Sequence, residues 1–237
     1  MILLALESSA DSSSVAILQD TKILAHQFVE EKYGHAERIV MQAEAVLSQA
    51  KIKISDIDYF IGGRGPGSFT GIRTCLAAVI GFSIVAGTPC FGINGLSALG
   101  CACSASLKNT GIQNEKLVVL AISDTRRGSF YCQEFKAENL IPSDIEDLTL
   151  PKLYEKIKAL AKSGFLVRIC GALSEDTLKF DDTLEKPELV HYYRYSLAAT
   201  DIAHFAAWQI ENGRELSPAT PIYLAPPNIN KPKKPSG

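Results

Sequence analysis

Residues 62–73 read Gly62-Gly63-Arg64-Gly65-Pro66-Gly67-Ser68-Phe69-Thr70-Gly71-Ile72-Arg73. An apolar run at 59–61 precedes them and an uncharged, apolar run at 74–86 follows, which predicts a strand, a glycine-rich loop and a helix. The glycines allow backbone conformations that side chains forbid, and they let another surface come close. Ser68 or Thr70 can accept hydrogen bonds from the first amides of the helix. This order of elements is typical of anion-binding sites and also of tight, closely packed turns.

The loop departs from the known phosphate-binding motifs. A P-loop opens its helix with Gly-Lys-Ser/Thr and a dinucleotide fingerprint reads G-x-G-x-x-G, whereas this loop carries arginines and a proline that lacks an amide donor. Two interpretations stay open: a loop that binds a ligand or partner, and a turn that only packs against its own fold. Both concern the same loop residues, which are Gly63, Arg64, Gly65, Pro66, Gly67, Ser68 and Thr70.

The composition indicates a globular protein in a reducing, cytoplasmic setting. The 237 residues are 46% hydrophobic and 21% charged, and the net charge of −2 offers no broad attraction to nucleic acid or anionic membranes. Six cysteines are scattered without a C-x-x-C pair, which argues against a disulfide scaffold. We expect no signal peptide and no membrane span, because Arg73 interrupts the apolar run at 71–86 and the run is shorter than about 20 residues.

Apolar periodicity predicts two lobes of mixed strands and helices. In the first lobe we expect strands at 2–6, 13–18, 22–30, 57–62 and 89–92, and helices at 34–50, from the glycine loop to about 85, and at 94–106. The second lobe echoes this order with strands at 117–122, 129–135 and 166–170, and helices at 152–161 and 197–211. The polar segment 106–115 marks the boundary, which predicts lobes at 1–106 and 107–237, the second ending in a basic, disordered tail at 231–234.

The glycine-rich stretch also carries a family resemblance. Gly63 to Arg73 resembles the G-R-G-P-G-S-F-T-G-V-R signature of the TsaB (YeaZ) family, whose members are small paralogues of TsaD, the catalytic subunit that makes N6-threonylcarbamoyladenosine next to the tRNA anticodon. The segments 3–18, 33–39 and 120–126 and the motif Pro221-Ile222-Tyr223-Leu224 are similar to further family segments in the same order. The resemblance spans essentially the whole chain, strongly in the first lobe and thinly over 135–195.

The resemblance implies an α/β fold of two lobes, the actin-like/sugar kinase/Hsp70-type ATPase fold, which is built from duplicated ribonuclease H-like lobes. Proteins of that fold hold ATP between the lobes, with Asp-x-Gly-Thr turns whose glycine amide approaches a phosphate while the aspartate orients metal-bound water. The corresponding positions here are Glu7, Ser9 and Asp124, and no glycine turn follows Asp124. We therefore expect a degenerate nucleotide cleft and no cofactor bound stably by this chain, with any ATP or ADP at the assembled complex.

The sequence lacks the motifs of metal and acyl-transfer catalysis. TsaD-type enzymes hold iron or zinc partly through an H-x-x-x-H helix motif, because histidines at i and i+4 share one face of a helix. Here His35 has Ile39 where the second ligand would be, and none of the four histidines pair at that spacing. A G-x-S-x-G nucleophile motif is also absent. We expect neither a catalytic residue nor a metal ligand in this chain.

A helix that packs on a core with one face needs apolar residues on that face only, and two of the expected helices are apolar over a wider surface. The run 74–86 is apolar on every side, and the helix expected at 34–50 has a wide apolar arc. Either the two helices cover each other completely, or they share an interface with a second subunit. We favour the interface, and its expected residues are His35, Val40, Met41, Arg73, Ala77, Ile80 and Gly81.

Together with the resemblance, these features predict a non-catalytic subunit that dimerises with a TsaD-type catalytic paralogue for threonylcarbamoyl transfer to tRNA adenosine. The resemblance further implies a TsaE-type ATPase in the complex, a homodimer when the chain is alone, contact with tRNA only through the complex, and no membrane. One alternative is an independent ATP-dependent transferase or kinase of the same fold, which nucleotide binding by the isolated chain would favour. A metallopeptidase, the other alternative, is disfavoured by the missing histidine pair.

Overall fold

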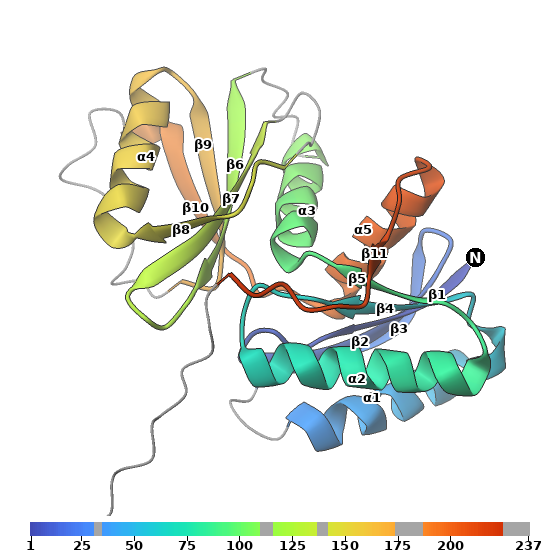
Figure 1. Cartoon of the computed structure of the whole chain (residues 1–237). Coiled ribbons are helices and arrows are strands. Elements are labelled where there is room, and N and C mark those ends of the chain that lie inside the picture. Colours follow the sequence, from blue (N-terminus) through green and yellow to red (C-terminus); the bar gives the residue numbers. More distant parts are fainter. Residues whose placement is uncertain (31–34, 110–115, 137–141, 174–186, 225–237) are drawn as a thin grey trace, which may run out of the picture.

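The computed structural model describes residues 1–30, 35–109, 116–136, 142–173 and 187–224, without the side chains of 35–37 and 108–109. Its strands form two sheets with helices on their faces (Figure 1). Sheet A has six strands in the order β11 (Ser217–Pro218), β5 (Cys90–Ile93), β4 (Tyr59–Gly63), β1 (Ile2–Glu7), β2 (Ser12–Gln19) and β3 (Lys22–Glu30). Sheet B has five strands in the order β10 (Val190–Arg194), β9 (Leu166–Gly171), β6 (Leu117–Asp124), β7 (Ser129–Lys136) and β8 (Glu146–Thr149).

Sheet A is built around β1, which is covered on both faces. The strand pairs antiparallel with β2 and parallel with β4. Because alternate side chains of a strand point to opposite faces, Leu4 and Leu6 pack with α1 (His35–Ala50) and α2 (Phe69–Ala86), whereas Leu3 and Ala5 pack with α5 (Ala199–Glu211). A continuous apolar run is what a strand covered on both faces requires.

Sheet B repeats the topology of sheet A. Its central strand β6 pairs antiparallel with β7 and parallel with β9, as β1 does with β2 and β4. The outer pairs β7–β8 and β9–β10 correspond in direction to β2–β3 and β4–β5. The helix α4 (Leu150–Lys162) follows β8 as α1 follows β3, and α5 follows β10 as α3 (Gly95–Asn109) follows β5. The chain therefore contains two copies of one α/β topology.

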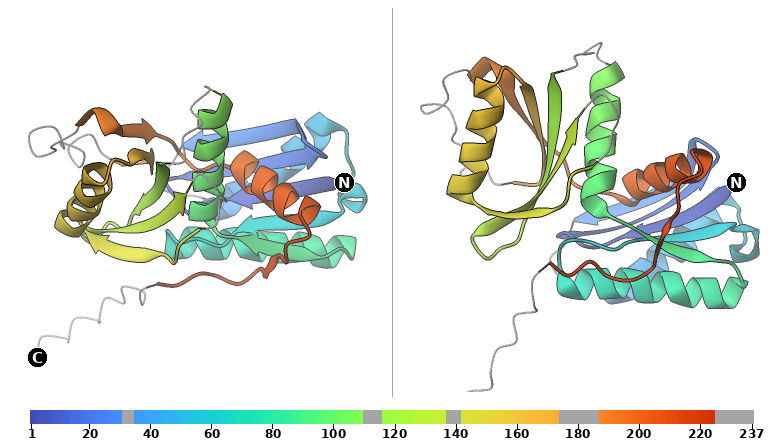
Figure 2. Two further views of the ribbon diagram at one scale, coloured as in Figure 1. Left: turned by 90° about the horizontal axis from the view of Figure 1, so that it is seen from above. Right: turned by 45° about the horizontal axis from the view of Figure 1, so that its top comes forward.

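The last helix of each copy covers the sheet of the other copy. After β5 of sheet A, α3 packs on β6, β7 and β9, whereas α5, which follows β10 of sheet B, packs on β1, β2 and β4. The two exchanged helices also contact each other, and Figure 2 shows α3 between the sheets with α5 lying on sheet A. The chain then returns to sheet A, where β11 pairs antiparallel with β5. The copies are thus joined by an exchange of helices as well as by the polypeptide connection.

Every helix and strand that the sequence predicts within the described residues is present, with ends shifted by a few residues. The strands β8, β10 and β11 are not predicted, because they lie at sheet edges, are short and lack a buried apolar run. The predicted boundary after residue 106 falls inside α3, and α5 and β11, assigned by sequence to the second lobe, lie with sheet A. The predicted helix start at Gly34 and the basic tail at 231–234 lie outside the described residues.

Candidate functional site

The glycine-rich loop packs directly against the turn between β1 and β2. A Cβ on Gly67 would lie 2.3 Å from the carbonyl oxygen of Ser9, and one on Gly71 would lie 1.8 Å from the carbonyl oxygen of Ser8. The Ser68 amide donates to the Ser9 carbonyl at 2.7 Å, and the Ser8 hydroxyl donates to the Gly71 carbonyl at 2.9 Å. Glycine at these two positions permits a backbone approach that any side chain would prevent.

The loop also begins α2 and connects it to the chain beyond β5. Ser68 caps the helix by accepting a hydrogen bond from the Gly71 amide at 3.3 Å, whereas Thr70, the other predicted cap, is exposed on the first turn. The Gly65 carbonyl accepts from the Gly95 amide at 2.9 Å. These contacts favour the packing interpretation of the loop, because the Ser68 amide and the Gly65 carbonyl already have partners within the chain.

Arg64 holds the C-terminal strap, which we define as residues 217–224. The Arg64 carbonyl accepts from the Ile222 amide at 2.8 Å, and its guanidinium donates to the Thr220 hydroxyl at 3.3 Å. Burial lowers the pKa of Arg64. The strap appears in red along the edge of sheet A in Figure 1. This arginine, one of two cations that the sequence offered for a phosphate, is bonded to the strap.

Arg73 anchors the strap near its end. Its Nε donates to the Tyr223 hydroxyl at 2.8 Å, and its guanidinium carbon lies 3.9 Å from the centroid of the Phe69 ring. The Phe69 and Tyr223 rings stack with centroids 5.2 Å apart. Arg73, predicted at a partner interface, therefore contacts its own chain.

A hollow next to this stack is lined by Pro66, Gly67, Phe69, Arg127, Tyr131, Ile222, Tyr223 and Leu224.

Glu7, the first residue of the predicted nucleotide cleft, is fully buried at the end of β1. Its Oε1 accepts from the Ser9 amide at 2.5 Å, and its Oε2 has no hydrogen-bond partner among the described residues. A Cβ on Gly63 would lie 1.6 Å from that Oε2. Burial raises the pKa of Glu7. Its own fold therefore encloses the Glu7 carboxyl at the position that the resemblance assigns to the cleft.

Asp124 lies in the equivalent turn of the second copy, between β6 and β7. Its carboxylate accepts from the Arg126 amide at 2.7 Å, and Arg126 adopts a left-handed φ of 57°. The Arg126 guanidinium forms an ion pair with Asp11 in the turn between β1 and β2. The two turns that the resemblance assigns to a nucleotide are thus bridged to each other. Sequence reasoning missed this pair, whose only signal was opposite charge at equivalent turns of the two copies.

The outer surface of α1 and α2 is apolar and exposed. The helices lie side by side on the face of sheet A opposite α5 (Figure 1). We call this surface the α1–α2 face, and its residues are Val40 (40% exposed), Met41 (66%), Ile80 (39%), Ile84 and Val85 (75% each) and the small exposed residues Ala77 and Gly81. The two helices therefore do not cover each other completely. Sequence analysis did not assign Ile84 and Val85 to the interface, and the side chain of His35 lies outside the described residues.

Within the described residues, α2 is the one helix that is long and apolar enough to cross a membrane, with a mean hydropathy of 1.8 over 18 residues. Of that stretch 28% is buried, on the side where Ile72, Cys75 and Val79 face the core. A helix that covers a sheet satisfies the same test of length and composition. The hydropathy of α2 alone therefore carries no argument for a membrane.

The described residues contain no group of three or more His, Cys, Asp or Glu side chains that could hold a metal ion. His26 lies on β3, His191 on β10 and His204 on α5, so these histidines belong to three separate elements.

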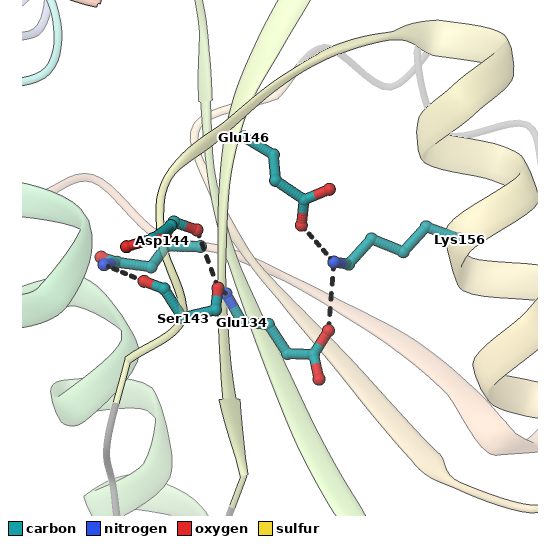
Figure 3. A network of polar contacts seen from close by, with 6 residues as sticks. Glu134, Ser143, Asp144, Glu146 and Lys156 are labelled. Carbon is teal, nitrogen blue, oxygen red and sulfur yellow. Dashed lines mark hydrogen bonds and ion pairs between the residues drawn. The ribbon is translucent and has the colours of Figure 1, made fainter.

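A polar network joins α4 to sheet B (Figure 3). The Lys156 Nζ lies 3.1 Å from Glu134 Oε2 and is also bonded to Glu146 Oε1. Burial lowers the pKa of Lys156, but the hydrogen bonds to Glu146 and Glu134 outweigh it and raise the pKa overall. A lysine that keeps its charge between two carboxylates anchors the helix and is a poor nucleophile.

The duplicated topology and the two bridged turns between the first strands of each copy define the class of protein. They are the features of the two-lobed actin-like/sugar kinase/Hsp70-type ATPase fold, with a ribonuclease H-like topology in each copy. A family model described as "TsaD: tRNA N6-adenosine threonylcarbamoyltransferase" matches residues 22–211. The chain belongs to this family, in its TsaB/YeaZ group.

Two curated relatives carry the name "tRNA threonylcarbamoyladenosine biosynthesis protein TsaB". The protein of Buchnera aphidicola subsp. Schizaphis graminum is 29% identical over 70% of this chain and 77% of its own length. That of Escherichia coli K12 is 31% identical over 58% of this chain and 56% of its own length. YeaZ from Pseudomonas aeruginosa shares the fold, with a TM-score of 0.72 and 21% identity over 94% of this chain and 99% of that chain.

Proposed function

We propose that this chain is a non-catalytic subunit of tRNA threonylcarbamoyladenosine biosynthesis that dimerises with a TsaD-type catalytic paralogue and activates or organises it. The names of the relatives support the pathway. In this proposal the chain works in the cytoplasm, forms a homodimer when alone, meets a TsaE-type ATPase in the complex and reaches tRNA only through that complex.

The α1–α2 face is the observation that carries the proposal. It groups exposed aliphatic side chains from two adjacent helices, with Ile84 and Val85 the most exposed of them. Contiguous apolar patches of this kind mark interaction sites, because leaving them in water favours association. A partner of the same family offers an equivalent pair of helices, so one face can serve a heterodimer with the paralogue or a homodimer. The two assemblies should therefore compete.

The nucleotide cleft supports a role without catalysis by this chain alone. The ion pair between Arg126 and Asp11 joins the two turns, and Glu7 is enclosed against Gly63. ATP or ADP would then bind at the assembled complex, where the paralogue supplies an intact site. Calorimetry with the isolated chain tests this: micromolar ATP affinity would instead favour an independent ATP-dependent transferase or kinase.

The interface is tested with Ala77→Glu and Ile84→Glu, two charges placed on the α1–α2 face. Both positions are exposed, so circular dichroism should show a native fold. An unpaired carboxylate in an apolar interface costs several kcal/mol, so affinity for the TsaD-type paralogue should fall by more than about tenfold. Ala159→Glu is the matched control, because it places the same charge at an exposed alanine of α4.

The readouts are co-purification with the paralogue and tRNA modification with and without this chain. We expect both to be lost for the two α1–α2 variants and kept for the control. Folded Ala77→Glu and Ile84→Glu proteins that still bind the paralogue and support modification normally would contradict the assignment of the face. The activating role would be contradicted if the chain binds the paralogue but tRNA modification proceeds equally well without the chain.

A further inference from the structure

Arg73 lies on the exposed side of α2, one helical turn before Ala77, the first residue of the α1–α2 face on that helix. The other α2 residues of the face continue the same exposed stripe at helical spacing. The side chains of Tyr223 and Leu224, which are 42% and 41% exposed, extend the apolar surface at this end of the helix. A partner that covers the stripe along its length therefore also covers Arg73.

The guanidinium of Arg73 is held in place by its own chain but keeps donors free. Its Nε donates to the Tyr223 hydroxyl at 2.8 Å, and its guanidinium carbon lies 3.9 Å from the centroid of the Phe69 ring and 5.8 Å from that of Tyr223. Among the described residues, its two terminal nitrogens have no hydrogen-bond partner and no carboxylate forms an ion pair with it. A planar fork that is already fixed in one orientation loses little entropy when it binds a carboxylate. Arg73 is thus preorganised for an anion that its own chain does not supply.

Covering this arginine imposes a condition on the partner. A guanidinium taken out of water without a counterion is an uncompensated buried charge, whereas a carboxylate bound to its fork offsets the lost hydration. The helix α2 carries no other charged residue, so the stripe itself offers no counterion. A phosphate of RNA would satisfy the same charge, but nucleic-acid sites gather several cations, and α2 and the strap together contain Arg73 alone. The surroundings of Arg73 therefore favour an acidic side chain of a protein partner.

We propose that Arg73 binds an aspartate or glutamate of the TsaD-type paralogue in the assembled interface and thereby helps to select that partner. This inference rests on the proposed function and adds to it the charge that the partner must present. The carboxylate accepts hydrogen bonds from the two terminal nitrogens, while the Nε stays bonded to Tyr223. A partner without an acid at this place would leave the guanidinium buried and unpaired, so the contact excludes purely apolar partners. An arginine among aromatic rings, next to an aliphatic patch, is also the kind of residue that contributes most to affinity at interfaces.

The test measures the binding of the full chain to the paralogue by surface plasmon resonance, after circular dichroism has shown that each variant is folded. Arg73→Met removes the charge, and affinity should fall by about thirtyfold or more, chiefly through faster dissociation, as it does when one partner of a buried charge pair is truncated. Arg73→Lys keeps the charge but lacks the planar fork and should recover only part of the affinity. Arg214→Met is the matched control and should bind as the wild type does. Arg214 is also exposed and lies over an aromatic ring, 4.5 Å from the Trp208 centroid, but in the segment after α5.

A charge reversal separates the ion pair from a role of Arg73 in holding the strap. Arg73→Glu should abolish binding, and each acidic residue on the equivalent helix pair of the paralogue is then changed to arginine in turn. One of these changes should restore binding, which a loosened strap could not explain. Wild-type affinity in Arg73→Met, or the lack of any paralogue variant that restores binding to Arg73→Glu, would overturn the proposal. Unchanged affinity for the paralogue with a loss of tRNA affinity in the assembled complex would also overturn it, because Arg73 would then bind a phosphate.

The variants Ala77→Glu and Ile84→Glu distinguish this inference from the proposed function. If they abolish binding to the paralogue and Arg73→Met does not, the α1–α2 face stands as the interface and the role of Arg73 is wrong. If none of the three variants affects binding, the proposed interface itself is wrong.

Discussion

Gly63 ends β4 so close to β1 that a Cβ added there would lie 1.6 Å from the Glu7 Oε2. Since Glu7 is fully buried and cannot swing into solvent, Gly63→Ala should destabilise the fold by about 1–3 kcal/mol, as overpacking of a core does. Gly81→Ala is the contrasting variant, because nothing lies within 4 Å of the added methyl. That change should stabilise α2 by about 0.5–1 kcal/mol. Urea unfolding measures both, and equal effects would contradict the crowding at Gly63.

Glu7 also gives the stability a specific pH dependence. Burial raises the pKa of Glu7 in the folded protein above 4.5, the value expected in the unfolded chain. At a pH between the unfolded and the folded pKa, the folded protein holds a proton that the unfolded chain has released. Stability therefore falls as the pH rises through this window. Glu7→Gln removes the titration, and its free energy of unfolding relative to wild type should be greater at pH ~7.5 than at pH ~4.5. A difference that is constant with pH, or that shrinks as the pH rises, would show that Glu7 ionises normally.

At the scale of elements, hydrophobic periodicity predicts nearly all of the secondary structure. The glycine loop is predicted because an apolar strand and an uncharged helix flank it, and Ser68 caps α2 as one of two expected residues. The edge strand β8 escapes prediction because its sequence Glu-Asp-Leu-Thr buries little and depends on pairing with β7. The strap's role is likewise hidden, because its hydrogen bonds to Arg64 and Arg73 join residues far apart in the chain.

The helix α4 is anchored by Lys156, which bonds Glu134 of β7 and Glu146 of β8 (Figure 3). Lys156→Met should destabilise the fold by about 1–3 kcal/mol, because it leaves two partly buried carboxylates facing each other. Lys158→Met, at an exposed site of the same helix, should change stability by less than about 0.5 kcal/mol. The pKa of Lys156 is raised in the folded protein above 10.5, its value in the unfolded chain. The contribution of Lys156 to the free energy of unfolding is therefore fully present below pH 10.5 and is lost as the pH rises through the pKa of the folded state. Chemical unfolding of both variants at neutral pH measures the difference, and equal losses would contradict the anchor.

At the scale of the whole molecule, the sequence indicates two related lobes but not how they are joined. An apolar stripe on a helix shows that the helix must be covered, and it carries no information about which sheet covers it. The exchange of α3 and α5 and the Arg126–Asp11 pair across the turns depend on tertiary contacts between the copies. The exposed α1–α2 face was partly foreseen, because α2 is apolar all round and only one side of it can meet the sheet.

The exchange predicts that the first copy cannot fold by itself. In a fragment of residues 1–109, the α5-facing side of sheet A would expose Leu3, Ala5, Leu18 and Ile61, which α5 buries in the intact chain. Exposing each large apolar side chain loses roughly 1–2 kcal/mol of stabilisation, and the apolar side of α3 would be uncovered as well. The total loss approaches the whole free energy of unfolding of a domain, which is about 5–15 kcal/mol.

A control protein for the 1–109 fragment joins residues 1–94 to residues 196–224 through a flexible linker. This protein lacks α3 but keeps α5 and β11, which can then cover and extend sheet A. We expect circular dichroism and urea titration to show cooperative unfolding for this protein and none for the 1–109 fragment. Coexpressed fragments 1–112 and 113–237 should assemble into a folded complex, since each supplies the helix that covers the other's sheet. A 1–109 fragment that unfolds cooperatively as a monomer would contradict the prediction and show that the first copy folds without α5.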